Sequence, residues 1–454
     1  MKIKGKKILL ALGALLMSSM QMSAQQAIPG ETVVNDNMLI DLTLQKAIEI
    51  ALAENPTIKV ADKDIELKKV ADTEAWQALL PTLDAQLALQ NSIKVAAIKT
   101  QMGEFKMGMD GSVTATGSVT LALPLFAPAV YQNMKLTKED IILAQEKSRS
   151  SKLDLINQVT KAYYAALLAQ DSYQVVQKAY NVTKENYDLV AKKFEVGKVS
   201  EYDKISAEVQ LRGMNSNVVS TQTGLSLAQL RLKVLMGIDS KINININDKL
   251  SNYESSLTLP NLNEQSDLSD NSALRQLDMN VGLLNRARKI IKTNFMPTIG
   301  LQLQGQYMSY SNDNWNVFKY KFSPAMTLAF AVSIPIYHAS NFTKLKSNKI
   351  QMAQLEDTRL NTQRQLNMAA ESYKRNMAST IAQVSSNAEA VKQAQKAVMI
   401  SSKRYEIGHG TILELNQSET AQTQAELTYV QSIYDYLTNQ ADLDYTLGRE
   451  TYLK

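Results

Sequence analysis

The strongest constraint on this chain is an internal duplication, because a fold that suits one half must also suit the other. Residues 193–197 (Lys-Phe-Glu-Val-Gly) align with residues 404–408 (Arg-Tyr-Glu-Ile-Gly), 211 positions further on. Other pairs at this offset are residues 124–126 with 335–337, and residues 235–237 with 446–448. Each half is therefore expected to form the same unit, with a helix, a strand, a loop, a strand, a very long helix, a turn and a helix.

Near the start of each copy the offset is 216, as between Asn55 and Asn271. The first copy therefore has five more residues than the second, and they fall between Pro81 and Pro124. Because all of this difference lies between two strand-like segments, it is expected to lengthen one loop and leave the rest of the unit unchanged.

Residues 1–24 are expected to be an export signal and not part of the fold. Four lysines within residues 2–7 precede the apolar run 8–17, and the small residues Ser23 and Ala24 follow. These lysines supply most of the formal net charge of +5, so the pI near 8.9 is no argument for a nucleic-acid partner.

Composition narrows the possible chemistry. Cysteine is absent, which excludes disulfides, thiol catalysis and a cysteine-linked lipid anchor. The two histidines, His338 and His409, are far apart in the sequence, and no glycine-rich phosphate loop follows a strand. We therefore expect no catalytic residues, no metal site and no cofactor, and the chain is predicted not to be an enzyme.

Four segments alternate apolar with small or amide side chains, which is typical of strands. They are residues 82–90, 113–123, 298–307 and 325–334. Strands of about 9–11 residues fit a tilted crossing of a bilayer, and the aromatic-rich loop 307–322 would suit an interfacial girdle. The same pattern also fits a half-buried sheet in a soluble protein.

Four strands are too few to close a barrel that spans a membrane, and open edges are not tolerated in lipid. A membrane-spanning form must therefore oligomerise. A dimer would give about 8 strands around a lumen filled by side chains, whereas a trimer would give about 12 and begin to leave an aqueous channel.

Two very long helices are predicted, over residues 127–196 and 340–407. Residues 135–195 and 341–405 contain neither proline nor glycine. At about 1.5 Å per residue, the first of these stretches alone would be about 90 Å long, so partner helices in coiled-coil packing are implied.

Each long helix is expected to end in a tight turn, at residues 197–200 and 408–411. Gly197 and Gly408 can adopt the left-handed conformation that ends a helix. Helices 201–236 and 412–447 then begin with predicted capping boxes, which are Ser200 with Asp203 and Thr411 with Glu414. Both turns should lie at the end opposite the strands.

In sequence this chain resembles the outer membrane efflux protein family, the TolC-like exit ducts of tripartite efflux pumps and type I secretion systems. The resemblance covers residues 42–448. It is carried by Leu-Thr-Leu-Gln-Lys-Ala at 42–47 and Ala-Glu-Asn-Pro at 53–56, by predicted turns at 124–126 and 335–337, and by the two Glu-Val/Ile-Gly tips.

The resemblance implies a mainly α fold with a transmembrane β-barrel. Three copies would form a homotrimer, with a 12-stranded barrel in the outer membrane and a long periplasmic α-barrel. A belt around the middle of the tube would include residues 241–270, which begin with the alternating strand 241–247. The implied function is a passive duct, and the implied partners are a periplasmic adaptor protein, an inner-membrane transporter and outer-membrane lipid.

The resemblance also implies a gate at the periplasmic tip. Asp203 falls on the acid of the closed-state network, Tyr405 on its tyrosine partner and Glu414 on the first of two acids around the aperture. Gln417 occupies the second acid position, and the arginine expected near Gly410 is missing. The residues implied to dock the adaptor are Val196, Gly197, Ser200, Ile407, Gly408 and Thr411.

These predictions divide the chain into the signal, a first repeat (25–240), the belt segment (241–270), a second repeat (271–448) and a short tail (449–454). The remaining alternative is a periplasmic coiled-coil adaptor or a structural envelope protein, which would also have long hairpins. Such a protein would need neither bilayer-length strands nor matched hairpin tips.

Overall fold

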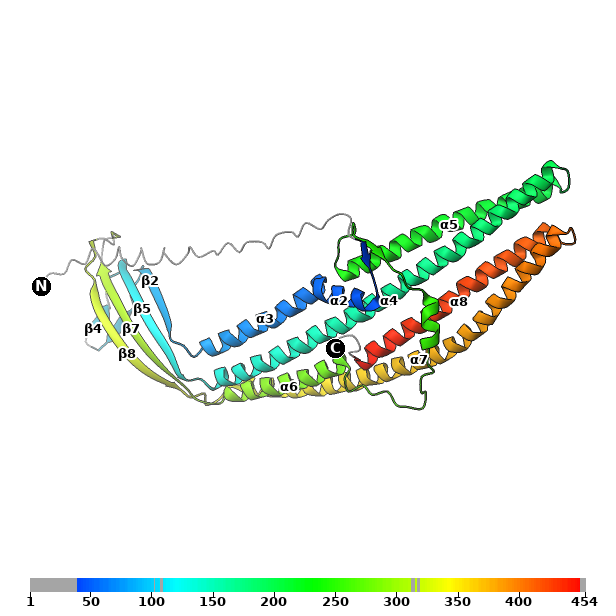
Figure 1. Cartoon of the computed structure of the whole chain (residues 1–454). Helices are drawn as coiled ribbons and strands as arrows, with labels where there is room; N and C mark the ends of the chain where they lie inside the picture. The colour runs from blue at the N-terminus through cyan, green and yellow to red at the C-terminus, as the bar shows by residue number, and fades with distance from the viewer. Residues whose placement is uncertain (1–38, 102, 107–108, 312–314, 317–318, 450–454) are drawn as a thin grey trace.

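The computed structural model describes residues 39–101, 103–106, 109–311, 315–316 and 319–449. The predicted signal, the last five residues of the tail and Phe318 of the predicted girdle lie outside this part of the chain. The molecule is elongated, with a sheet at one end, packed helices in the middle and two helical hairpin tips at the far end (Figure 1).

The sheet contains four antiparallel strands in the order β2-β5-β7-β8. The strands are β2 (Thr82–Ser92), β5 (Ser112–Phe126), β7 (Thr298–Ser311) and β8 (Ser323–Ser333). The two copies meet at the β5–β7 pair, so β2 and β8 are the edge strands. A row of leucines runs across one face in register, through Leu83, Leu121, Leu303 and Leu328.

The outer side chains of this row are largely uncovered by the rest of the chain, while Leu303 in the middle is partly covered. Leu83 is 70% exposed and Leu328 is 68% exposed, and Leu87 on the same face reaches 90%. Tyr307 and Trp315, from the predicted girdle, are each 60% exposed. An uncovered apolar face of this size marks a surface that meets lipid or another protein.

Two strand features differ from the sequence prediction. The residues after Leu123 were predicted to form a turn, but β5 continues to Phe126, with a shift in register between Pro124 and Phe126. Proline has no N–H to give to a ladder, so it is accommodated at such an irregularity. The longer loop of the first copy also folds into a two-stranded hairpin, β3 (Ala97–Thr100) with β4 (Gly103–Lys106), which the pattern did not predict.

The helices recur with the same bounds in both copies. At an offset of 216, α3 (Pro56–Gln77) corresponds to α6 (Ser272–Thr293). At an offset of 211, α4 (Pro128–Glu195) corresponds to α7 (Ala339–Glu406), and α5 (Glu201–Met236) to α8 (Ile412–Leu447). With 68 residues each, α4 and α7 are about 100 Å long.

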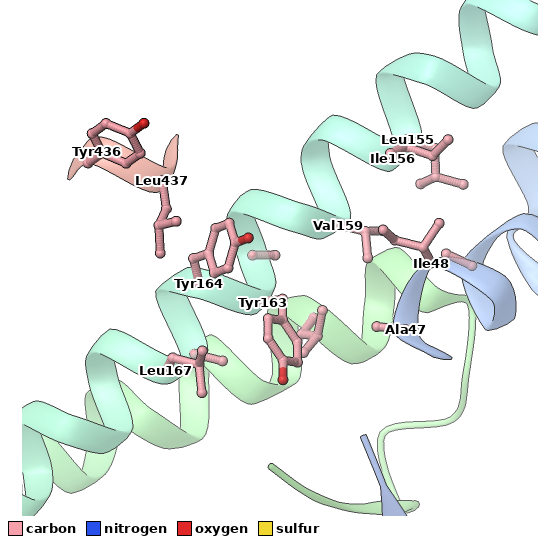
Figure 2. Close-up of a cluster of buried hydrophobic side chains, with 14 of the residues drawn as sticks. Ala47, Ile48, Leu155, Ile156, Val159, Tyr163, Tyr164, Leu167, Tyr436 and Leu437 are labelled. Atoms are coloured by element: carbon pink, nitrogen blue, oxygen red, sulfur yellow. The ribbon is translucent and has the colours of Figure 1, made fainter. Parts of the chain in front are cut away.

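The main core lies midway along the molecule, where α2 (Leu44–Glu54) crosses α4 (Figure 2). Ile48 from α2, Tyr163 and Leu167 from α4, and Tyr436 from α8 are each at most 1% exposed. Burying a large apolar side chain contributes about 2 kcal/mol, so this cluster anchors the helices before they diverge toward the tips.

The belt segment packs beside this core. The predicted strand 241–247 is shorter in the structure, where only β6 (Asn243–Asn245) pairs, in parallel with β1 (Leu39–Asp41). The side-chain amides of Asn245 and Asn247 both donate to Asp41 Oδ1, at 2.8 and 3.2 Å. After β6 the chain forms a 3₁₀ helix, η2 (Leu250–Ser256), whose first residue is fully buried.

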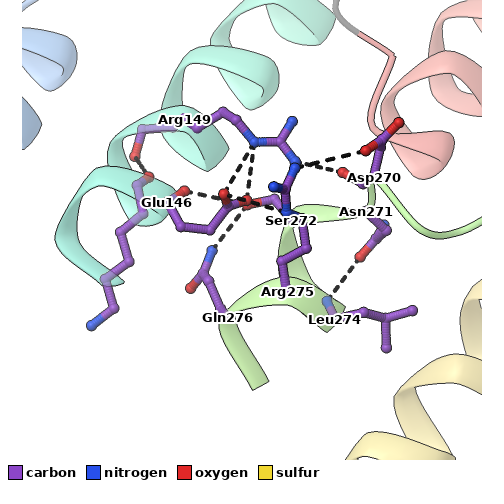
Figure 3. Close-up of polar contacts among 10 residues, drawn as sticks. Glu146, Arg149, Asp270, Asn271, Ser272, Leu274, Arg275 and Gln276 are labelled. Atoms are coloured by element: carbon purple, nitrogen blue, oxygen red, sulfur yellow. Dashed lines mark hydrogen bonds and ion pairs between the residues drawn. The ribbon is translucent and has the colours of Figure 1, made fainter. Parts of the chain in front are cut away.

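A buried polar cluster joins the start of α6 to α4 (Figure 3). Glu146 on α4 is only 6% exposed and accepts hydrogen bonds from Arg149 Nε (3.0 Å) and Ser272 Oγ (2.6 Å). Arg275 lies 3.8 Å from the same carboxylate, and Arg149 also donates to the carbonyl oxygen of Asp270 at 2.5 Å. Two guanidinium groups therefore compensate the buried negative charge of Glu146, which would be unfavourable without a partner.

Candidate functional site

The two tips are turns of the same construction, one in hairpin 1 (α4 and α5) and one in hairpin 2 (α7 and α8). Lys198 N donates to Lys193 O, and His409 N donates to Arg404 O, each at 2.8 Å. Gly197 and Gly408 have φ values of 70° and 80°, a left-handed conformation that costs glycine nothing. Both tips lie at the end of the molecule opposite the sheet (Figure 1).

The residues implied to dock a partner are exposed at these tips. Val196 is 67% exposed and Ile407, its counterpart at the offset of 211, is 68% exposed. Gly197, Ser200, Gly408 and Thr411 complete the two turns and are all exposed. Each tip thus presents one apolar side chain at an equivalent position.

Only the first of the two predicted capping boxes is complete. Asp203 N donates to Ser200 Oγ (3.2 Å), and Ser200 N donates to Asp203 Oδ2 (3.1 Å). In hairpin 2, Glu414 N donates to Thr411 Oγ1 (3.2 Å), but the Glu414 carboxylate does not return the contact. It lies instead 3.5 Å from Arg404 Nη1, so the prediction of a second full capping box was wrong.

Arg404 also explains the glycine at position 410, near which the resemblance implied an arginine. A Cβ on Gly410 would come within 3.1 Å of Arg404 Cβ and the Tyr405 backbone nitrogen, so the turn packs closely against the last turn of α7. Arg404 Nη2 donates to His409 O at 3.2 Å. A guanidinium is therefore present at the tip, supplied from α7.

Tyr405 and Asp203 lie near each other, but no hydrogen bond joins their side chains in the described part of the chain. Tyr405 is 8% exposed and packs with Val190, Ala207 and Leu415, where residues of both hairpins meet. Burial raises the pKa of Tyr405, and the negative charge of Asp203 raises it further. The Tyr405 hydroxyl has no hydrogen-bond partner among the described residues, and the Asp203 carboxylate accepts from Ser200 Oγ at 2.8 Å.

One further contact between the hairpins lies at this meeting point. The Lys193 ammonium group of hairpin 1 lies 4.6 Å from the centre of the Tyr405 ring, a cation–π geometry. Glu414 and Gln417 are both exposed, three residues apart on α8. Of the four predicted gate positions, Asp203 therefore lies near Tyr405, and Glu414 contacts Arg404, which precedes Tyr405. In the described part of the chain, no hydrogen bond or ion pair joins Glu414 or Gln417 to Asp203 or Tyr405.

A residue that the sequence analysis missed lies just behind the tip. Glu419 on α8 is buried (8% exposed) and accepts a hydrogen bond from the side-chain amide of Asn186 on α4. Burial raises the pKa of Glu419 to about 7, against the hydrogen bonds from Asn186 and Thr183, which lower it. The sequence does carry a signal, because Glu419 continues the apolar spacing of Ile412 and Leu415.

Along the described part of the chain, no helix is both long and apolar enough to cross a membrane. No group of three or more acidic or imidazole side chains is placed to hold a metal ion there either.

Comparisons with known proteins agree with this architecture. The family profile described as "Outer membrane efflux protein" matches residues 47–238 and 265–449, well over half of the chain. The alkaline protease secretion protein AprF of Pseudomonas aeruginosa is 22% identical, covering 90% of this chain and 84% of AprF. The outer membrane protein TolC of Salmonella enteritidis is 21% identical, covering 89% of this chain and 82% of TolC.

A solved structure supports the fold. The CmeC outer membrane channel of Campylobacter jejuni superimposes with a TM-score of 0.68 at 16% identity, covering 93% of this chain and 90% of CmeC. At this level of identity the superposition shows a common fold.

Proposed function

The chain belongs to the outer membrane efflux protein family, and on that premise we propose that it is the outer-membrane exit duct of a tripartite efflux or type I secretion system. The observation that carries this proposal is the separation of two surfaces in one molecule. An uncovered apolar sheet lies at one end, and two matched hairpin tips lie about the length of a long helix away. A duct that is fixed in a bilayer and opened from the periplasm needs both.

The working form in this proposal is a homotrimer. The edge strands β2 and β8 each pair on one side only within the described sheet, so the free edge of β8 in one copy can pair with the free edge of β2 in the next. Three copies then close a barrel of about 12 strands, which begins to leave an aqueous channel. The apolar row through Leu83 and Leu328 would face lipid.

The helices would continue this tube into the periplasm as an α-barrel. Exposed apolar side chains recur along α5, including Val209, Val219 and Val234, and would be covered by a neighbouring copy. The belt segment would surround the tube at the level of the main core.

The tip would be the gate and the docking end. Val196 and Ile407 offer apolar contacts to a periplasmic adaptor, which links the duct to an inner-membrane transporter. Opening separates the hairpins at Asp203, Tyr405, Glu414 and Gln417, a shift between two packings that the adaptor biases. The duct itself performs no chemical step and uses no cofactor.

The proposal is tested by fractionating cells and reconstituting the purified protein in planar bilayers. It should extract with outer-membrane detergent fractions, run as a heat-sensitive trimer and conduct ions. A soluble monomer without conductance would contradict the duct and favour a periplasmic coiled-coil adaptor.

The gate is tested with Glu414→Ala and Asp203→Ala. Both variants should leak more at rest, because each removes a contact or a cap that holds a tip turn in place. Glu406→Ala is the matched control, since it removes an exposed carboxylate at the end of α7. Unchanged resting conductance in both gate variants would count against these residues as the lock.

A further inference from the structure

Glu419 on α8 is hydrogen-bonded to α4 close behind the tips. It accepts from Asn186 through Oε1, while Oε2 has no hydrogen-bond partner in the described residues. On the tip side, Val190 of hairpin 1 packs in one cluster with Leu415 of hairpin 2. Separating the hairpins would therefore bring the carboxyl group from a buried position into water.

The charged groups on the surrounding helices do not compensate this carboxyl. On α4, Lys184 and Glu185 are exposed, and on α5, Arg212 pairs with Glu208 at 2.7 Å. On α7, Lys403 is exposed and Arg404 pairs with Glu414. On α8 itself, Glu426 accepts from Gln422 at 2.8 Å. The influences on the Glu419 pKa are burial and two neutral hydrogen-bond donors, with no cation among them.

We propose that Glu419 is a proton-controlled latch of the gate, which holds the two hairpins together when it is protonated and favours their separation when it is ionised. A buried carboxylate without a cation is unfavourable, whereas the neutral acid keeps the hydrogen bond from Asn186 and tolerates burial. The latch rests on the proposed function, because only a duct has a closed and an open packing of these hairpins.

The direction of the pH effect follows from linkage. In the closed packing the pKa of Glu419 is about 7, whereas its ordinary value, expected once the hairpins part, is 4.5. The closed packing therefore binds the proton more tightly, and its advantage is largest below the ordinary value and is lost as pH rises to about 7. From pH 8 to pH 6 the open-to-closed ratio should fall about tenfold per protomer.

The test is resting conductance of the reconstituted full chain from pH 5 to pH 8. The wild type should conduct more as pH rises, with the change complete near neutral pH. Glu419→Gln mimics the protonated acid at nearly the same size, so it should stay at the low-pH level throughout. Glu406→Gln, which removes an exposed carboxylate near the tip, should keep the wild-type pH response.

A second variant distinguishes a Glu419 that acts through its protonation from one that acts only through packing. Asn186→Ala removes a hydrogen bond that lowers the Glu419 pKa, so the midpoint of the pH response should move to higher pH. A purely structural effect would change the level of conductance and leave the midpoint in place.

The outcomes are distinguishable. A conducting channel whose pH response survives Glu419→Gln, or whose conductance rises as pH falls, overturns the latch and leaves the duct standing. A protein that never conducts, at any pH, overturns the duct and the latch with it.

Discussion

Arg404 and Glu414 face each other across the tip turn of hairpin 2, with Nη1 of the guanidinium 3.5 Å from Oε2 of the carboxylate. Both side chains are about half exposed, so the pair is worth well under 1 kcal/mol to stability. In the proposed gate, the pair would act mainly through the charge it places at the aperture. A carboxylate paired in this way attracts passing cations less than a free one.

Arg404→Gln should therefore make the channel more selective for cations, because the Glu414 carboxylates lose their counter-charge. The measurement is the reversal potential across a bilayer with a salt gradient. Lys403→Gln removes an exposed cation from the preceding residue and should change the selectivity less. Equal shifts in the two variants would show that overall charge matters and the pair does not.

Asn271→Ala should destabilise the protein by about 2–3 kcal/mol, from a lost helix cap and an unpaired buried carbonyl. Asn271 Oδ1 accepts from Leu274 N (3.1 Å) while Nδ2 donates to Thr446 O (2.7 Å), so one side chain starts α6 and ends α8. Thermal unfolding followed by circular dichroism measures the effect. Asn215→Ala, at an exposed position on α5, should change the midpoint little.

Gly448→Ala should be far more damaging than Gly197→Ala, although both glycines have φ near 70°. A Cβ on Gly448 would lie 2.1 Å from the carbonyl oxygen of Asp270, whereas one on Gly197 meets nothing within 4 Å. Gly197→Ala should cost only the left-handed conformation, about 1–2 kcal/mol. The readout is the yield of the proposed heat-sensitive trimer, and equal yields from the two variants would contradict the close approach.

Leu328→Lys should reduce the protein recovered in the outer membrane, because it places a charge on the apolar row of the sheet. Such a charge costs about 2–4 kcal/mol at the middle of a bilayer. Thr327→Lys, on the opposite face of the same strand, should insert normally if that face lines an aqueous lumen. If Thr327→Lys is the more damaging variant, the two faces of the sheet are assigned the wrong way round.

Much of the fold could be predicted from local signals. The constant offsets located both copies, glycines at 197, 237, 408 and 448 end the four hairpin helices, and alternation located the strands. Helix ends and strand faces depend on residues that are close in sequence, which is why a single sequence reveals them. The details that failed, such as the end of β5 after Pro124, depend on the partner strand.

The amino-acid sequence by itself determined the duplication, the long helices, the two tip turns and the family. Only the tertiary structure decided that β5 pairs with β7, that Arg404 takes Glu414 away from its cap, and that Glu419 is buried beside Asn186. Each of these contacts joins residues at least ten positions apart in the sequence, and the last joins two different hairpins. The free energy of the contact between Glu419 and Asn186 depends on how much water the packed helices exclude. That exclusion is a property of the assembled hairpins and not of either segment alone.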